Sequence, residues 1–150
     1  MSVVCIEIAY RAGLRVKEIA RLHSDNINLE KGVIEVREGS KNGKFRDVSI
    51  RTPDIAYFTD LKEEMKGQYI CRGVSEDSLN RGIRRVMQDL SLDKKYYATT
   101  IHSIRKLYAS ERMQEEREKG LNERDSWCVV QQNLGHGNKF REELYKIYIK

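Results

Sequence analysis

The sequence predicts a mainly helical α+β domain in which helices surround a small antiparallel sheet. Apolar residues recur at helical spacing through most of the chain, whereas residues 33–50 form two β-favouring runs around an Asn-Gly pair. A length of 150 residues suits one domain with one core. An apolar content of 39% and a single proline argue against intrinsic disorder. We therefore expect one folded domain over residues 1–150.

Two helices are expected at the N-terminus, over residues 2–12 and 15–22. The first carries apolar residues on most of its sides and should be largely buried, and Ala12-Gly13 breaks it. The second has an apolar stripe that leaves its charged residues towards the other side. This stripe consists of Val16, Ile19, Ala20 and Leu22. Arg15 is expected in the first turn of the second helix.

Residues 33–50 predict a β-hairpin, and a helix follows it to about Lys66. Asn42-Gly43 between two β-favouring runs is a strong short-range signal for a hairpin turn. Thr52-Pro53 opens the helix, because proline suits the first helical position. Residues 69–71 are expected to form a short extended piece.

Further helices are expected in the second half of the chain. The first begins after the cap residue Ser75, and its apolar side faces away from a basic side. The basic side consists of Arg81, Arg84 and Arg85. The second runs from about residue 101 to 118 after a threonine cap, and it places His102 and Arg105 on one face. Two shorter helices should follow, around residues 126–133 and 138–149.

The composition favours an anionic partner and gives no sign of a membrane, metal or nucleotide site. Lys and Arg number 28 against 23 Asp and Glu, which leaves a net charge of +5. No stretch resembles a spanning helix or a signal peptide, so we expect an intracellular protein without a membrane partner. Cys5, Cys71 and Cys128 are expected to be packing residues rather than a disulfide framework or a zinc site. The hairpin loop fails the spacing of a P-loop and no metal-ligand motif is present, so neither a cofactor nor a metal is expected.

His102 and Arg105 lie three residues apart on a helix and could contact one ligand group together. Alone, the pair is better explained as a partly buried histidine and a solvated arginine. Support comes from two further motifs, one near each end of the chain. Near the N-terminus, Glu18 follows Gly13-Leu14-Arg15 by three residues, and near the C-terminus, Tyr145 follows Leu134-Gly135-His136 by nine residues. Together with a lysine in the hairpin, this order resembles the catalytic set of the tyrosine recombinases of the phage-integrase type.

The resemblance covers nearly the whole chain and implies a role for each of these residues. Arg15 and Arg105 would hold the scissile DNA phosphate, since guanidinium groups can neutralise phosphate oxygens bidentately. His102 and His136 would fill the other phosphate-side positions, and Lys41 would protonate the leaving 5′-oxygen. Tyr145 would attack the phosphate and form a 3′-phosphotyrosyl bond to DNA, without a metal or other cofactor. Glu18 would orient one of the arginines, although a plain helix-surface glutamate is equally expected.

Two of these assignments have competitors within the chain. Lys44 competes with Lys41, because the hairpin loop is about two residues longer than common versions of the family loop. Tyr148 competes with Tyr145 on the same helix, and the spacing from His136 favours Tyr145. Further DNA-backbone contacts are expected from the basic residues of the hairpin and of the helix after Ser75. The alternative is that these residues form an exposed basic surface that does not contact DNA. They are Lys44, Arg46, Arg81, Arg84 and Arg85.

The resemblance also implies a partner and a domain organisation. Double-stranded DNA is the expected partner, and the full-length protein is expected to self-associate as a tetramer on paired DNA sites in the cytoplasm, at the nucleoid. Residues 1–150 would be a single catalytic domain without the N-terminal core-binding domain of the family, and so a fragment. A non-catalytic DNA-binding domain is the leading rival, and type IB topoisomerases and telomere resolvases share much of the same residue set.

Overall fold

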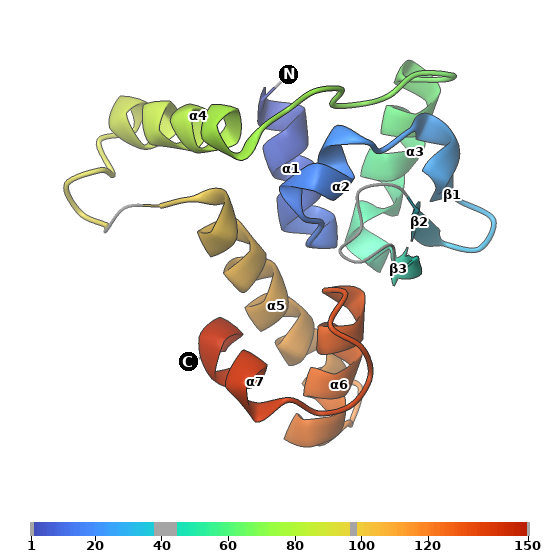
Figure 1. Ribbon diagram of the computed structural model, residues 1–150. Helices are drawn as coiled ribbons and strands as arrows, with labels where there is room; N and C mark the ends of the chain where they lie inside the picture. The colour runs from blue at the N-terminus through green and yellow to red at the C-terminus, as the bar shows by residue number, and fades with distance from the viewer. Residues whose placement is uncertain (1, 38–44, 97–98, 150) are drawn as a thin grey trace.

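Helices make up most of the structure, and three short strands form one antiparallel sheet (Figure 1). The computed structural model describes residues 2–37, 45–96 and 99–149. The helices are α1 (Ser2–Ala12), α2 (Val16–Ala20), α3 (Ile55–Glu64), α4 (Glu76–Asp89), α5 (Ile101–Glu118), α6 (Glu123–Asn133) and α7 (Glu142–Tyr148). The strands are β1 (Ile27–Asn28), β2 (Val33–Val36) and β3 (Arg46–Ser49), with 3-10 turns at Ser24–Asn26 and Thr52–Asp54. This architecture confirms the expected fold class.

Helix α1 is the central helix of the larger hydrophobic cluster. Its residues Cys5, Ile8 and Ala9 are fully buried, and the helix packs against α4 and α5. It ends at Ala12, where the sequence predicts a break, and the next residue, Gly13, has a φ of +67°. A Cβ at Gly13 would lie only 2.4 Å from the ring of Tyr108 on α5. Glycine is therefore required here both by the backbone conformation and by the close approach of α5.

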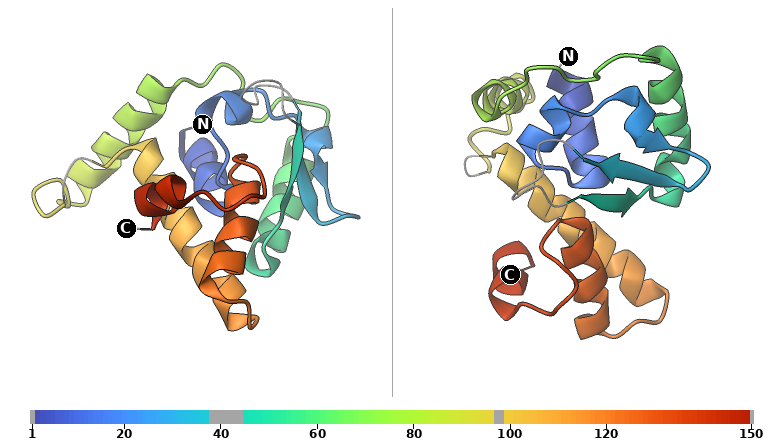
Figure 2. Two further views of the ribbon diagram at one scale, coloured as in Figure 1. Left: turned by 60° about the horizontal axis from the view of Figure 1, so that its bottom comes forward. Right: turned by 45° about the vertical axis from the view of Figure 1, so that its right-hand side comes forward.

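The sheet, seen from two further sides in Figure 2, has the order β1-β2-β3, and both pairs of neighbouring strands are antiparallel. Ile34 of β2 pairs with Val48 of β3, and both side chains are fully buried against the core, whereas their neighbours along the strands are more exposed. This alternation is that of a sheet with one covered face. The hairpin expected from residues 33–50 is confirmed in its two strands, whereas Lys41 and Lys44 lie outside the described residues.

A second hydrophobic cluster lies between α5, α6 and α7. Its largest members are Tyr108, Trp127 and Tyr148, each at most 6% exposed. Helix α5 belongs to both clusters, because its first residue Ile101 packs with α1 and the elements around it, and Tyr108 two turns later packs with α6 and α7. Figure 1 shows α5 as the link between the part of the molecule around α1 and the part formed by α6 and α7. The single core expected from chain length is thus two clusters joined along one helix.

Several local features differ from the sequence expectations. Cys5 and Cys71 form a disulfide across 66 residues, so they are not merely packing residues, and Cys128 is free. Their separation in sequence gave no pairing signal, since only the packing of α1 brings them together. Strand β1 was not expected, because two residues are too short for a period-two pattern. In the described part of the chain, no helix is long and apolar enough to cross a membrane.

Candidate active site

Arg105 is a buried arginine that joins three distant segments of the chain. It lies on α5 and is 7% exposed. Its Nε donates a hydrogen bond of 2.8 Å to the carbonyl of Gly13, and its Nη2 donates one of 3.0 Å to the carbonyl of Leu134. Its Nη1 donates a hydrogen bond of 3.1 Å to the hydroxyl of Tyr148 on α7. Two backbone carbonyls therefore fix the plane of the guanidinium, and its remaining side faces α7.

Tyr148 and Tyr145 lie three residues apart on α7, but their hydroxyl groups have different surroundings. Tyr148 is 6% exposed, and its hydroxyl oxygen lies 3.5 Å from Nε2 of His136 in addition to its contact with Arg105. Its ring lies 5.9 Å from the ring of His102. The hydroxyl of Tyr145 instead donates a hydrogen bond to the carboxylate of Glu123 on α6. The structure thus brings Tyr148, and not the favoured Tyr145, to Arg105.

The loop before α7 positions the helix so that Tyr148 is the tyrosine that faces Arg105. Gln131 of α6 is fully buried and its amide nitrogen donates to the carbonyls of Gly137, at 3.2 Å, and of Lys139, at 2.5 Å. Its amide oxygen accepts a hydrogen bond of 3.0 Å from the backbone N–H of Arg141. These bonds set where α7 begins and how the helix is rotated. The spacing from His136, which favours Tyr145, does not report this rotation of the helix.

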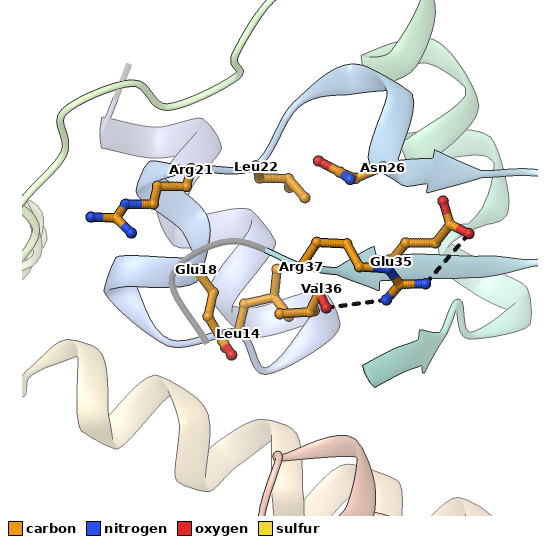
Figure 3. Close-up of a pocket in the computed structure, with 8 residues that line it drawn as sticks. All are labelled: Leu14, Glu18, Arg21, Leu22, Asn26, Glu35, Val36 and Arg37. Carbon is orange, nitrogen blue, oxygen red and sulfur yellow. Dashed lines mark hydrogen bonds and ion pairs between the residues drawn. The ribbon is translucent and has the colours of Figure 1, made fainter. Parts of the chain in front are cut away.

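Arg15 lies at the N-cap of α2 rather than within its first turn, and Glu18 fixes it there. One carboxylate oxygen of Glu18 accepts a hydrogen bond of 2.8 Å from the backbone N–H of Arg15, which is the capping-box arrangement. Nη1 of Arg15 lies 3.6 Å from the other oxygen. Figure 3 shows Glu18 and Arg21 leaving α2 in different directions, beside a small pocket that is also lined by Val36 and Arg37.

Glu18 forms its strongest ion pair with Arg46, at the start of β3. Nη1 of Arg46 donates to one carboxylate oxygen and Nη2 donates to the other at 3.0 Å, while Nε donates to the carbonyl of Asn133 at 3.0 Å. Burial acts to raise the pKa of Glu18, but the bonds from Arg46 and Arg15 outweigh it and lower that pKa below its usual value. Arg46, expected to contact DNA, instead donates hydrogen bonds within the protein from all three of its guanidinium nitrogens, and its side chain is 10% exposed.

Gly135 lets Arg15 and Arg46 come together beneath the Leu134-Gly135-His136 turn. Its φ is +91°, and a Cβ there would lie 2.7 Å from Nη1 of Arg15 and 3.0 Å from the guanidinium carbon of Arg46. His136 follows directly, and its backbone N–H donates a hydrogen bond of 3.0 Å to the carbonyl of Gln131. The glycine of this motif is therefore needed for the contact with the two arginines as well as for the turn.

His102 lies on the exposed side of α5, one turn before Lys106 and next to the ring of Tyr148. Partial burial among protein atoms lowers the pKa of His102 from its usual value, and the positive charges of Lys106 and Arg105 lower it further. Burial likewise lowers the pKa of Arg105, with Arg15 acting in the same direction. An arginine keeps its charge at neutral pH, whereas a histidine so placed is held in its neutral form, which can accept a proton.

The structure therefore brings together most of the residues that the sequence singled out. The group around Tyr148, called the Tyr148 site from here on, consists of Arg15, His102, Arg105, His136 and Tyr148. The arginines of α4 are exposed; they are Arg81, Arg84 and Arg85. Within the described residues, no group of three or more His, Cys, Asp or Glu side chains could hold a metal ion.

Comparison with known proteins gives matches over almost the whole chain. The model of the phage integrase family matches residues 2–148. Tyrosine recombinase XerA of Pyrococcus furiosus is 27% identical over an alignment 147 residues long, which covers 92% of this chain and 47% of that protein. Tyrosine recombinase XerD of Staphylococcus epidermidis is 28% identical over 150 residues, with 93% and 48% covered. The chain thus spans about half the length of these curated relatives.

Solved structures share the fold at lower sequence identity. A crystal structure of XerA recombinase superposes with a TM-score of 0.62 at 20% identity, covering 99% of this chain and 56% of that one. The Tn1549 transposon integrase, solved in complex with circular intermediate DNA, superposes with a TM-score of 0.58 at 14% identity, covering 97% of this chain and 56% of that one. The arrangement of α1 to α7 around the sheet is therefore one that is already known in these proteins.

Proposed function

The chain belongs to the phage integrase family, and from this premise we propose that it cuts and rejoins DNA strands at specific sites through a covalent bond between Tyr148 and a DNA 3′-phosphate. The observation that carries the proposal is the contact of the Tyr148 hydroxyl with Arg105, at 3.1 Å, and its 3.5 Å distance from His136. A tyrosine hydroxyl beside a fixed guanidinium and an imidazole is the pairing that attack on a phosphodiester requires.

In this proposal, Arg15, Arg105 and His136 hold the scissile phosphate and stabilise the charge that builds up on its non-bridging oxygens. Charge stabilisation of this kind is strongest when donors are fixed before the reaction and water is excluded. The carbonyls of Gly13 and Leu134 fix Arg105 in this sense, and Glu18 fixes the backbone of Arg15. Guanidinium groups suit the task because their planar forks match the phosphate oxygens.

Tyr148 is the proposed nucleophile. A phenol is a weak nucleophile at neutral pH, so the reaction needs positive charge beside the oxygen and a group that takes the proton. Arg105 supplies the charge at 3.1 Å, and neutral His102, whose ring faces that of Tyr148, is the proposed proton acceptor. The phenolic oxygen bonds to phosphorus while the bond from phosphorus to the 5′-oxygen breaks. The strand can be rejoined by the reverse reaction, because the energy of the broken bond is kept in the new one.

The leaving 5′-oxygen must receive a proton, which we assign to a lysine of the hairpin. Lys41 remains the proposed donor and Lys44 its competitor, and both lie outside the described residues. Strands β2 and β3, which carry this hairpin, lead directly to Arg46 and its contact with Glu18. The proposed reaction needs no metal or other cofactor, since two arginines provide the charge stabilisation.

Double-stranded DNA is the proposed partner, with further phosphate contacts from the exposed basic face of α4, formed by Arg81, Arg84 and Arg85. We further propose that residues 1–150 act as one catalytic unit, that the protein works as a tetramer on paired sites, and that it acts at the nucleoid. A passive DNA-binding domain is the alternative. It would have no need for a buried tyrosine hydroxyl bound to an arginine, which is why strand transfer is preferred.

Covalent trapping tests the proposal. The chain is incubated with a pool of nicked duplexes of randomised sequence, and protein bound to labelled strands is separated on a denaturing gel. We expect an adduct that blocks digestion from the 3′ end of the strand but not from its 5′ end. Gel-shift binding without any adduct would instead identify a passive DNA-binding domain. Joining of strands from two different duplexes would separate a recombinase from an enzyme that only relaxes supercoils.

A further inference from the structure

Glu18 is a buried carboxylate within reach of two arginines, and only one of them is proposed to touch DNA. Its side chain is 1% exposed, and nearly all of its hydrogen-bonding capacity is used inside the protein. Arg46 donates hydrogen bonds to both carboxylate oxygens of Glu18, and the backbone N–H of Arg15 donates to one of them. The guanidinium of Arg15 lies 3.6 Å away, which is an ion-pair distance but longer than a hydrogen bond.

The position of Arg46 does not depend on Glu18 alone. Its Nε donates to the carbonyl of Asn133, and the side-chain oxygen of Asn133 accepts a hydrogen bond of 3.3 Å from the backbone N–H of Ser49 on the same strand. Arg46 is therefore held between β3 and the end of α6 and presents two further N–H groups to Glu18. Its side chain is 10% exposed, so water cannot readily take its place.

A buried carboxylate that loses its partner is expected to form an ion pair with the nearest cation, because an unpaired buried charge is energetically unfavourable. Without Arg46, that cation is Arg15, which already lies within 3.6 Å. A direct hydrogen-bonded pair between Glu18 and Arg15 would draw the guanidinium towards α2 and cancel the charge that the phosphate needs. Gly135 imposes no barrier to this movement, since it has no side chain between the two arginines.

We propose that Arg46 is a positioning residue that occupies the Glu18 carboxylate and so keeps the guanidinium of Arg15 available for the scissile phosphate. This role rests on the proposed function of the Tyr148 site. It differs from the DNA-backbone contact expected from the sequence, because Arg46 acts through Glu18 and Arg15 without touching DNA. It also differs from a purely structural role, because the activity lost on removing Arg46 is attributed to the unpaired carboxylate of Glu18.

This distinction gives a test in which a second substitution repairs the first. Arg46→Gln should slow adduct formation on the nicked duplex pool by about 100-fold, the scale of a catalytic group displaced by about 1 Å. Glu18→Gln combined with Arg46→Gln should be about 10-fold faster than Arg46→Gln alone, because no carboxylate remains to bind Arg15. A double variant that is no faster than Arg46→Gln would overturn the proposal.

Arg51 provides the matched control. It is a 12% exposed arginine whose Nε donates a hydrogen bond of 2.7 Å to Glu115, away from the Tyr148 site. Arg51→Gln also removes an arginine from a partly buried carboxylate, and it should lower thermal stability without changing the rate of adduct formation in the folded protein. If Arg46→Gln does not fold, Arg46→Met serves in its place because it also leaves the Glu18 carboxylate without a cation at position 46, and adding Glu18→Gln to it should again raise the rate.

A readout that needs no catalysis separates this role from the proposed function. Inorganic phosphate is titrated into the wild-type chain and the Arg46→Gln variant, and the side-chain Nε–H signal of Arg15 is followed by NMR. We expect weaker phosphate binding in the variant and recovery in the double variant. Identical titrations would overturn the positioning role, whereas absence of a DNA adduct from the wild-type chain would overturn the proposed function.

Discussion

The hydroxyl of Tyr148 accepts a hydrogen bond of 3.1 Å from Nη1 of Arg105, across 43 residues of sequence. Arg105 is in turn held by the carbonyls of Gly13 and Leu134, so one guanidinium connects the end of α1, the turn after α6 and the last helix. The hydrogen bond between Arg105 and Tyr148 makes α7 part of the site, and the rotation of that helix determines which of its tyrosines contacts Arg105.

Gly135→Ala should damage the site through a clash with the arginines. A Cβ there would lie 2.7 Å from Nη1 of Arg15, so we expect adduct formation to slow by about 100-fold as Arg15 is displaced. Gly137 offers a matched control, because its φ of +84° imposes similar backbone strain while nothing lies within 4 Å of its would-be Cβ. Gly137→Ala should lose a comparable amount of thermal stability but little activity. Equal loss of activity in both variants would show that strain alone is responsible.

The stability of the protein should fall in acid partly through Glu18. Its pKa is lowered in the folded chain, so the contribution of Glu18 is complete above its unfolded pKa of about 4.3 and is lost as the pH falls through the lower folded value. Urea unfolding between pH 7 and pH 3 should show this loss in the wild-type chain. The loss should be smaller in Glu18→Gln, and an identical pH dependence in the two proteins would contradict the proposed ion pairing.

The proton donor in the hairpin can be identified by changing the leaving group. Lys41→Ala should slow cleavage at an ordinary 5′-oxygen by about 100-fold or more, the usual scale of general acid catalysis. A substrate with sulfur in place of that oxygen should be cleaved by this variant at the wild-type rate, because a thiolate leaves without a proton. Lys44→Ala is the control and should be slowed on neither substrate. The opposite pattern would assign the role to Lys44.

Much of the site was predictable because its residues lie in short local motifs. Gly13-Leu14-Arg15 with Glu18 marks the junction of α1 and α2, and a spacing of three on one helix places His102 beside Arg105. The helices of the fold were predictable for the same reason, since each carries its own apolar stripe. Such signals are local and survive in a single sequence.

Other features depend on contacts between distant segments and left no local signal. The contact of Tyr148, rather than Tyr145, with Arg105 depends on the hydrogen bonds that Gln131 makes with the loop before α7. The pairing of Arg46 with Glu18 joins β3 to α2, so no local pattern around Arg46 predicts this buried ion pair. The pairing of Cys5 with Cys71 likewise arises only when α1 packs in the core.

The identity of the nucleophile is tested most directly by locating the DNA on the protein. Trypsin cleaves after Lys146 and so places Tyr145 and Tyr148 in different peptides, which allows mass spectrometry of the trapped adduct to assign the nucleotide to one tyrosine. We predict a nucleotide-bearing peptide that contains Tyr148, with no adduct from Tyr148→Phe and a normal amount from Tyr145→Phe. A nucleotide on Tyr145 would contradict the account, because its hydroxyl is bound to Glu123 and faces away from Arg105.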